Sequence, residues 1–145
     1  MSTTGMATDR WTRLGAVGAR VIGAGLVAAN AWIHLDLYLS GYRTLHTIGP
    51  LFALNAALGA AIALALLAVP RRWLGWAALA GALFEFGTLG ALLISASVGL
   101  FGFKETLDVR LASTSIAVES IGGVVLLALA AMELRPRWTG LRRTW

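Results

Sequence analysis

Four apolar stretches, each long enough to cross a lipid bilayer, occupy most of this sequence. An α-helix rises about 1.5 Å per residue, so roughly 20 apolar residues span a hydrocarbon core of about 30 Å. The stretches predict membrane-spanning helices over residues 14–39, 48–69, 73–99 and 112–134. We therefore predict an all-α fold: an integral membrane antiparallel four-helix bundle forming one transmembrane domain, residues 14–134.

The composition agrees with a membrane protein. Only 13% of the 145 residues are charged, whereas a soluble domain carries about 25%. The mean hydropathy is +0.76. There is no cysteine, which excludes disulfides, thiolate metal ligands and cysteine nucleophiles. Arg greatly outnumbers Lys, and Ala and Gly are frequent, a bias that we interpret as a sign of bacterial origin.

The segments between the predicted spans have the composition of connections. Residues 40–46 are mostly polar with one glycine, and Pro70 followed by two arginines predicts the end of the second span and a short turn. The segment 100–111 is longer and mixes aromatic, basic and acidic residues. For this segment we expect a short helix lying on the membrane surface.

Basic residues are distributed unequally between the two sides of the predicted bundle. Nine arginines are expected on one side: Arg10, Arg13, Arg20, Arg71, Arg72, Arg135, Arg137, Arg142 and Arg143. Only Arg43, Lys104 and Arg110 are expected on the other side. The positive-inside rule then predicts a multi-pass protein of the cytoplasmic (inner) membrane. Both termini would be cytoplasmic, with an N-terminal tail of residues 1–13 and a basic tail of residues 135–145.

The N-terminal part of the sequence also has features of a secretory signal peptide. A basic leader precedes an apolar run from Val21, and Ala29-Asn30-Ala31 has the small residues of a cleavage site. The apolar stretch continues to Leu39, however, which gives it the length of a complete span. We therefore expect an uncleaved first helix, and cleavage would leave the later spans unchanged.

Two carboxylates, Glu85 and Glu119, lie within the third and fourth apolar stretches. A charge at the centre of a bilayer costs roughly 3 kcal/mol on insertion scales, so such residues are rare. Small residues lie one or two helical turns from each carboxylate, as in Gly81 before Glu85 and Gly122 after Glu119. Because helices pack through small residues in lipid, both carboxylates are predicted to face the interior of the bundle.

Three further polar residues, Asn30, His34 and Asn55, lie in the first two spans at depths that would bring them near the two carboxylates. Together, the five residues would line a polar track that opens to the outside and ends near Glu85. No Lys or Arg lies deep in a span to pair with Glu85, which is therefore expected to be protonated. Two interpretations stay open: the carboxylates carry protons, or they donate structural hydrogen bonds.

The two histidines of the sequence, His34 and His46, flank the first connection. Two imidazoles near Glu119 would suit zinc, copper or a haem iron with two histidine ligands. The simpler interpretation, which we favour, is that both histidines make hydrogen bonds at the membrane interface.

Four arginines follow the last span: Arg135, Arg137, Arg142 and Arg143. Basic residues directly after a span attract anionic lipid headgroups with about 1 kcal/mol each. The interleaved tryptophans also favour a membrane interface. We therefore expect this tail to contact the lipid bilayer and not nucleic acid.

The sequence contains no phosphate-binding Gly-rich loop with its lysine, no H-E-x-x-H and no G-x-S-x-G. We therefore predict a non-catalytic membrane component without a cofactor, either a scaffold or a subunit of a larger complex. The first alternative is a proton-coupled transporter or channel that acts as a homo-oligomer through Glu85 and Glu119. The second is a redox protein that binds a metal or haem through His34 and His46. The motifs assign no family.

Overall fold

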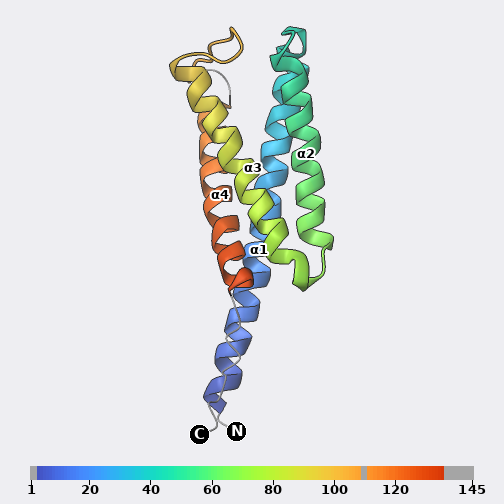
Figure 1. Ribbon diagram of the computed structural model, residues 1–145, viewed down its shortest axis with the longest axis vertical. Helices are drawn as coiled ribbons and strands as arrows, with labels where there is room; N and C mark the ends of the chain where they lie inside the picture. The colour runs from blue at the N-terminus through green and yellow to red at the C-terminus, as the bar shows by residue number, and fades with distance from the viewer. Residues whose placement is uncertain (1–2, 109–110, 136–145) are drawn as a thin grey trace, which may run out of the picture.

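The computed structural model describes residues 3–108 and 111–135, and it is all-helical (Figure 1). Its helices are α1 (Thr3–Ser40), the short 3₁₀ helix η1 (Tyr42–Thr44), α2 (Ile48–Ala68), α3 (Arg71–Ser97) and α4 (Ala112–Leu134). Within these residues, four helical segments are long and apolar enough to cross a membrane. The prediction of an all-helical protein with four helices able to cross a membrane is confirmed.

Helix α1 is longer than the first predicted span. It begins at Thr3 and therefore includes residues that were predicted to form an N-terminal tail. Figure 1 shows this part of α1 extending beyond the ends of the other helices. The sequence has no proline before Pro50, so nothing in this region removes a backbone donor and breaks the helix.

The helices pack as two pairs. Helix α1 lies along α2, and α3 lies along α4, with further contacts between α1 and α4. Contacts between α2 and α3 are few, although Val69 and Pro70 alone connect them. In Figure 1 the two pairs are apart at the end that carries η1 and residues 98–108. We call this the η1 end of the bundle, and the opposite end the Pro70 end.

Small residues allow the pairs to approach closely in the middle of the bundle. Leu126 of α4 is fully buried and inserts beside Gly23 of α1 and Gly81 of α3. A Cβ atom at Gly23 would lie 2.5 Å from Leu126 Cδ2, and one at Gly81 would lie 2.9 Å from Leu126 Cδ1. A side chain at either position would force the buried Leu126 side chain to shift. This packing is typical of membrane helices, which associate through small residues.

An arginine closes the C-terminal end of α2 at the Pro70 end. Arg20 of α1 donates hydrogen bonds to the backbone oxygens of Leu66, Leu67 and Val69, at 2.6, 2.7 and 2.8 Å. The last carbonyl groups of a helix have no intrahelical partner, and a cation there also stabilises the helix dipole. Arg20 therefore joins α1 to α2.

The connection between α3 and α4 corrects one expectation. The composition of this segment predicts a surface helix, but residues 98–108 contain none. Gly99, Phe101 and Gly102 have φ values of 90°, 51° and 78°, which a right-handed helix does not allow. Leu100 and Phe103 instead exchange backbone hydrogen bonds of 2.7 and 2.9 Å, which form a tight turn. The expected helix is therefore wrong for these residues.

Candidate ligand-binding cavity

The two carboxylates predicted to face the interior, Glu85 and Glu119, are both inside the bundle. Glu85 of α3 is 0% exposed and Glu119 of α4 is 1% exposed, which confirms the prediction that they face the interior. Gly122 makes room for Glu85, because a Cβ atom at position 122 would lie 3.2 Å from the carboxyl carbon of Glu85. Gly122 lies one turn after Glu119 on α4 and contacts Glu85 of α3, so the small residue marks the buried face of α4.

Asn30 of α1 connects Glu85 to the neighbouring helix. Its side-chain nitrogen donates to Glu85 Oε2 at 3.0 Å and to Thr88 Oγ1 at 3.2 Å. The Thr88 hydroxyl in turn donates to the backbone oxygen of Phe84 at 2.8 Å. The second carboxylate oxygen, Glu85 Oε1, has no hydrogen-bond partner among the described residues. One buried polar cluster thus links α1 and α3.

Glu119 receives support for only one of its oxygens. The hydroxyl of Ser115, one turn earlier on α4, donates to Glu119 Oε1 at 2.7 Å. Within residues 3–108 and 111–135, neither Glu119 Oε2 nor Asn55 Oδ1 of α2 has a hydrogen-bond partner. Both atoms are buried acceptors without a donor.

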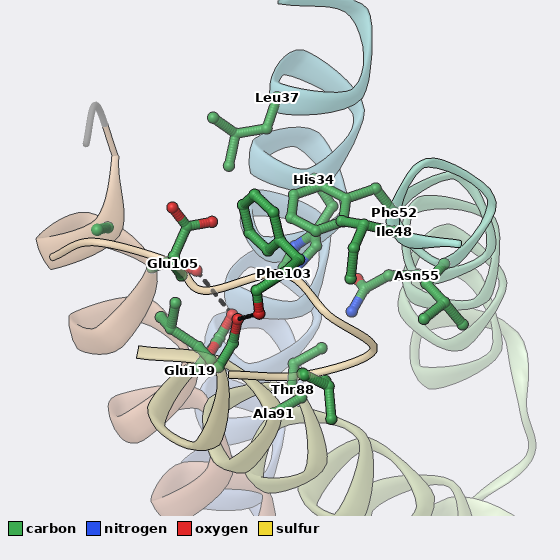
Figure 2. A pocket seen from close by; sticks show the side chains of 16 residues that line it. His34, Leu37, Ile48, Phe52, Asn55, Thr88, Ala91, Phe103, Glu105 and Glu119 are labelled. Carbon is green, nitrogen blue, oxygen red and sulfur yellow. Dashed lines mark hydrogen bonds between the residues drawn. The ribbon is translucent and has the colours of Figure 1, made fainter. Parts of the chain in front are cut away.

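A cavity of about 130 Å³ lies near these two acceptors, towards the η1 end. All four transmembrane helices contribute to its wall, with His34 from α1, Asn55 from α2, Thr88 from α3 and Glu119 from α4. Figure 2 shows Asn55 pointing towards the centre of the cavity from the side opposite Glu119. The polar residues that the sequence spreads over four spans therefore converge on one cavity.

The connection between α3 and α4 forms the roof of the cavity at the η1 end. Phe103 and Glu105 line both the cavity and a shallow depression on the outer surface, so they separate the two. The Tyr42 hydroxyl donates to Glu105 Oε2 at 2.8 Å, and its ring stacks on Phe52 with centroids 4.6 Å apart. Burial, and then the hydrogen bond to the Glu105 carboxylate, raise the pKa of Tyr42.

We infer that the cavity opens at the side of the bundle between α2 and α3, because each of these helices contributes an exposed residue to its lining. Leu51 of α2, which is 39% exposed, and the exposed Ala91 of α3 both belong to its lining. These two helices make few contacts with each other, in keeping with an opening at this position. We call the opening marked by Leu51 and Ala91 the side mouth.

The two histidines occupy different environments. The His34 ring lies 5.0 Å from the Phe52 ring, and its Nδ1 is 3.1 Å from the backbone oxygen of Asn30. A carbonyl only accepts, so Nδ1 carries the proton and Nε2 is an acceptor when the ring is neutral. His46 is exposed and is not part of the cavity lining. Among the described residues, no three His, Cys, Asp or Glu side chains are grouped as a metal site, and the His34–His46 site stays a prediction.

The structure brings together the residues proposed for the polar track. Four of them lie on the cavity wall or hydrogen bond to a residue there, and Glu85 joins them through Asn30. Sequence reasoning missed the roof, namely Tyr42, Phe103 and Glu105. The one feature of the sequence that could have indicated the roof is Glu105, a carboxylate in a connection that also carries Phe101 and Phe103. Of the arginines predicted to contact lipid, Arg135 is exposed at the end of α4, and Arg137, Arg142 and Arg143 lie outside the described residues.

Comparisons with protein-family models, with curated protein sequences and with solved structures find no match for this chain. The chemistry of the cavity is therefore the basis for assigning a function.

Proposed function

We propose that this protein is a non-catalytic integral membrane protein that binds a small molecule in the cavity at the η1 end. The observation that carries the proposal is Glu119, a cavity-lining residue whose buried Oε2 has no hydrogen-bond donor among the described residues. A buried polar atom without a hydrogen bond costs about 1–3 kcal/mol. A ligand that donates a hydrogen bond to Glu119 removes this cost.

The size of the cavity fits a small ligand. Its volume of about 130 Å³ is close to that of an apolar protein cavity of about 150 Å³ that binds benzene. Apolar and aromatic side chains form most of the wall, with a few polar groups that converge from different helices. This combination is typical of small-molecule sites.

The topology belongs to the same proposal. We propose an antiparallel arrangement in the bacterial cytoplasmic membrane with both termini in the cytoplasm, as the excess of arginine predicts. The η1 end then faces outwards, and the cavity lies in the outer half of the bilayer. A fluorescent protein that folds only in the cytoplasm, fused to the C-terminus, should fluoresce. A dark fusion that is present in the membrane contradicts this topology.

Assembly with a second copy or with another membrane subunit remains part of the proposal. A Cβ atom at Gly15, Gly18 or Gly25 of α1 would meet no atom within 4 Å, so this helix has exposed positions that another helix can approach closely. The cavity nevertheless lies within one copy of the chain, so ligand binding does not depend on assembly.

A native mass spectrum of the protein, extracted from its own membrane in mild detergent, tests the proposal. The wild type should retain a small molecule, and Ala91→Phe should lose it because the larger side chain closes the side mouth. Ala80→Phe is the matched control, since Ala80 is an exposed alanine on α3 outside the cavity lining. Retention by all three proteins, or by none, contradicts the proposed site.

Proton-coupled transport is the second candidate, and the Glu85 cluster favours it. Asn30 and Thr88 continue the polar wall of the cavity to Glu85, whose Oε1 is unpaired among the described residues. Such a cluster would carry a proton between the cavity and the middle of the bundle. In liposomes loaded with a pH-sensitive dye, wild type should move protons and Glu85→Gln should not. Equal rates exclude proton transfer through Glu85.

A further inference from the structure

The hydroxyl groups on the cavity wall are already engaged as donors. Thr88 donates to the backbone oxygen of Phe84 at 2.8 Å, and Ser115 donates to Glu119 Oε1 at 2.7 Å. Ser95 donates to the backbone oxygen of Phe103 at 3.4 Å. A hydroxyl has one hydrogen to donate, so these three side chains offer only lone pairs to a ligand.

The remaining polar residues of the wall carry mainly acceptor atoms without a donor. Glu119 Oε2 and Asn55 Oδ1 have no donor among the described residues, and His34 Nε2 is an acceptor in the neutral ring. The amide nitrogen of Asn55 is the remaining side-chain donor on the wall. The hydrogen-bonding pattern therefore favours a ligand that donates.

The charged residues of the wall also favour a ligand that donates hydrogen bonds, and in particular a cation. Glu105 and Glu119 line the cavity, but no Arg or Lys is among its described lining residues. Arg20 is bound to the carbonyl groups at the end of α2, and Lys104 lines the depression on the other side of the roof. A buried carboxylate requires a cation or a proton for compensation.

Aromatic rings complete the environment. Phe52 and Phe103 line the cavity, and Tyr42 contacts both, with ring centroids 4.6 and 5.9 Å away. The faces of aromatic rings attract cations. The side mouth, by contrast, is formed by the apolar residues Leu51 and Ala91.

We propose that the ligand is a small organic cation, a primary ammonium group on an apolar body, whose N–H groups donate to Glu119 Oε2 and Asn55 Oδ1. Its apolar body points to the side mouth, so the ligand enters from the bilayer between α2 and α3. This assignment rests on the proposed function, because it names the class of molecule that the cavity binds.

Three probes with the same ring and different charge test the assignment: benzylamine, benzyl alcohol and benzoate. Their affinities for the purified protein are measured by ligand-detected NMR titration at neutral pH. Wild type should bind benzylammonium best and benzoate least. In Glu119→Gln the affinity for benzylammonium should fall about tenfold, because a charge-assisted hydrogen bond is lost, while that for benzyl alcohol changes little.

Glu133→Gln is the matched control, since Glu133 pairs with Arg71 outside the cavity. It should bind all three probes as the wild type does. If the native mass spectrum shows a retained molecule but benzylammonium has no advantage over benzyl alcohol, the cation assignment is wrong and the binding cavity stands. If no molecule is retained and no probe binds, both proposals are wrong.

The ammonium group has two sources, a free amine or the headgroup of an aminophospholipid. Nanodiscs with equal amounts of phosphatidylethanolamine and phosphatidylglycerol separate them. Enrichment of phosphatidylethanolamine on wild type but not on Glu119→Gln supports the headgroup. Saturable benzylamine binding without such enrichment supports a free amine, and the absence of both overturns the assignment.

Discussion

At the scale of the residue, Asn30 has the most consequential contacts in the transmembrane region. Its amide group is fully buried, and it supplies the hydrogen bond that Glu85 receives from α1. A single side chain thereby compensates a buried carboxyl group and joins two helices. The amide oxygens of Asn30 and Asn55 are both buried without a partner among the described residues, but of the two side chains only Asn30 donates to a buried carboxylate.

This difference predicts unequal effects of two identical substitutions. Asn30→Ala should lower the free energy of unfolding by about 1–3 kcal/mol, because it leaves Glu85 buried without a donor. Asn55→Ala should cost clearly less, since it removes an acceptor that makes no hydrogen bond. Thermal unfolding in detergent, followed by circular dichroism, measures both. Equal losses of stability in the two variants would show that the Asn30–Glu85 hydrogen bond does not contribute measurably to the free energy of unfolding.

The single residues also explain what the sequence could predict. The apolar environment of Glu85 and Glu119 and their small neighbours were enough to infer burial, because membrane helices pack through small residues. The partner of Glu85 was not predictable, because it depends on the rotation of α1 against α3. Apolar stretches fix the length of a helix but not its rotation about its own axis.

At the scale of the element, the ends of the helices depend on contacts from other elements. Arg20 of α1 donates to three backbone oxygens at the end of α2. From the sequence, Arg20 indicates only the orientation of the bundle, because its distance to the end of α2 is set by the pairing of the two helices.

Arg20→Ala should therefore destabilise the bundle. Hydrogen bonds to a charged group contribute about 1.5–3 kcal/mol, so a drop of this order in the free energy of unfolding is expected. Arg72→Ala is the control, because Arg72 is an exposed arginine at the start of α3. Thermal unfolding that is equally affected in both variants would mean that loss of a positive charge, and not loss of the helix cap, is responsible.

The roof depends on Tyr42, and this predicts a pH effect. Burial and the Glu105 carboxylate raise the pKa of Tyr42 in the folded protein. A raised pKa means that the neutral phenol stabilises the fold below its unfolded pKa of about 10, and that this contribution disappears as the pH rises further. Wild type should thus lose more stability than Tyr42→Phe between neutral pH and strongly alkaline pH.

Tyr38→Phe provides the comparison, as the sequence contains only two tyrosines. It should follow the wild type in thermal unfolding across the same pH range. If Tyr42→Phe loses stability with rising pH as steeply as the wild type, the hydrogen bond to Glu105 does not hold the roof.

At the scale of the whole molecule, the four helices form two pairs that separate towards the η1 end, where the α3–α4 connection covers the cavity (Figure 1). Hydropathy predicted the helices but not this arrangement. The cavity arises where the two helix pairs separate, and hydropathy does not report how helices pack against each other. The expected surface helix was wrong for a related reason. A turn takes the place of this helix. One of its left-handed residues is Phe101, a residue type that does not predict a turn from the sequence.

The central claim is that a small molecule can enter the cavity and reach its polar wall. The chain has no native cysteine, so single cysteines introduced at Asn55 and Ala56 report access directly. Asn55 lines the cavity, whereas its neighbour Ala56 is buried outside the lining. The measurement is the rate of modification by methanethiosulfonate-ethylammonium, itself a small ammonium cation, in mild detergent. We predict that Asn55→Cys reacts at least roughly tenfold faster than Ala56→Cys, and equal rates, or no reaction at either position, would contradict an accessible cavity.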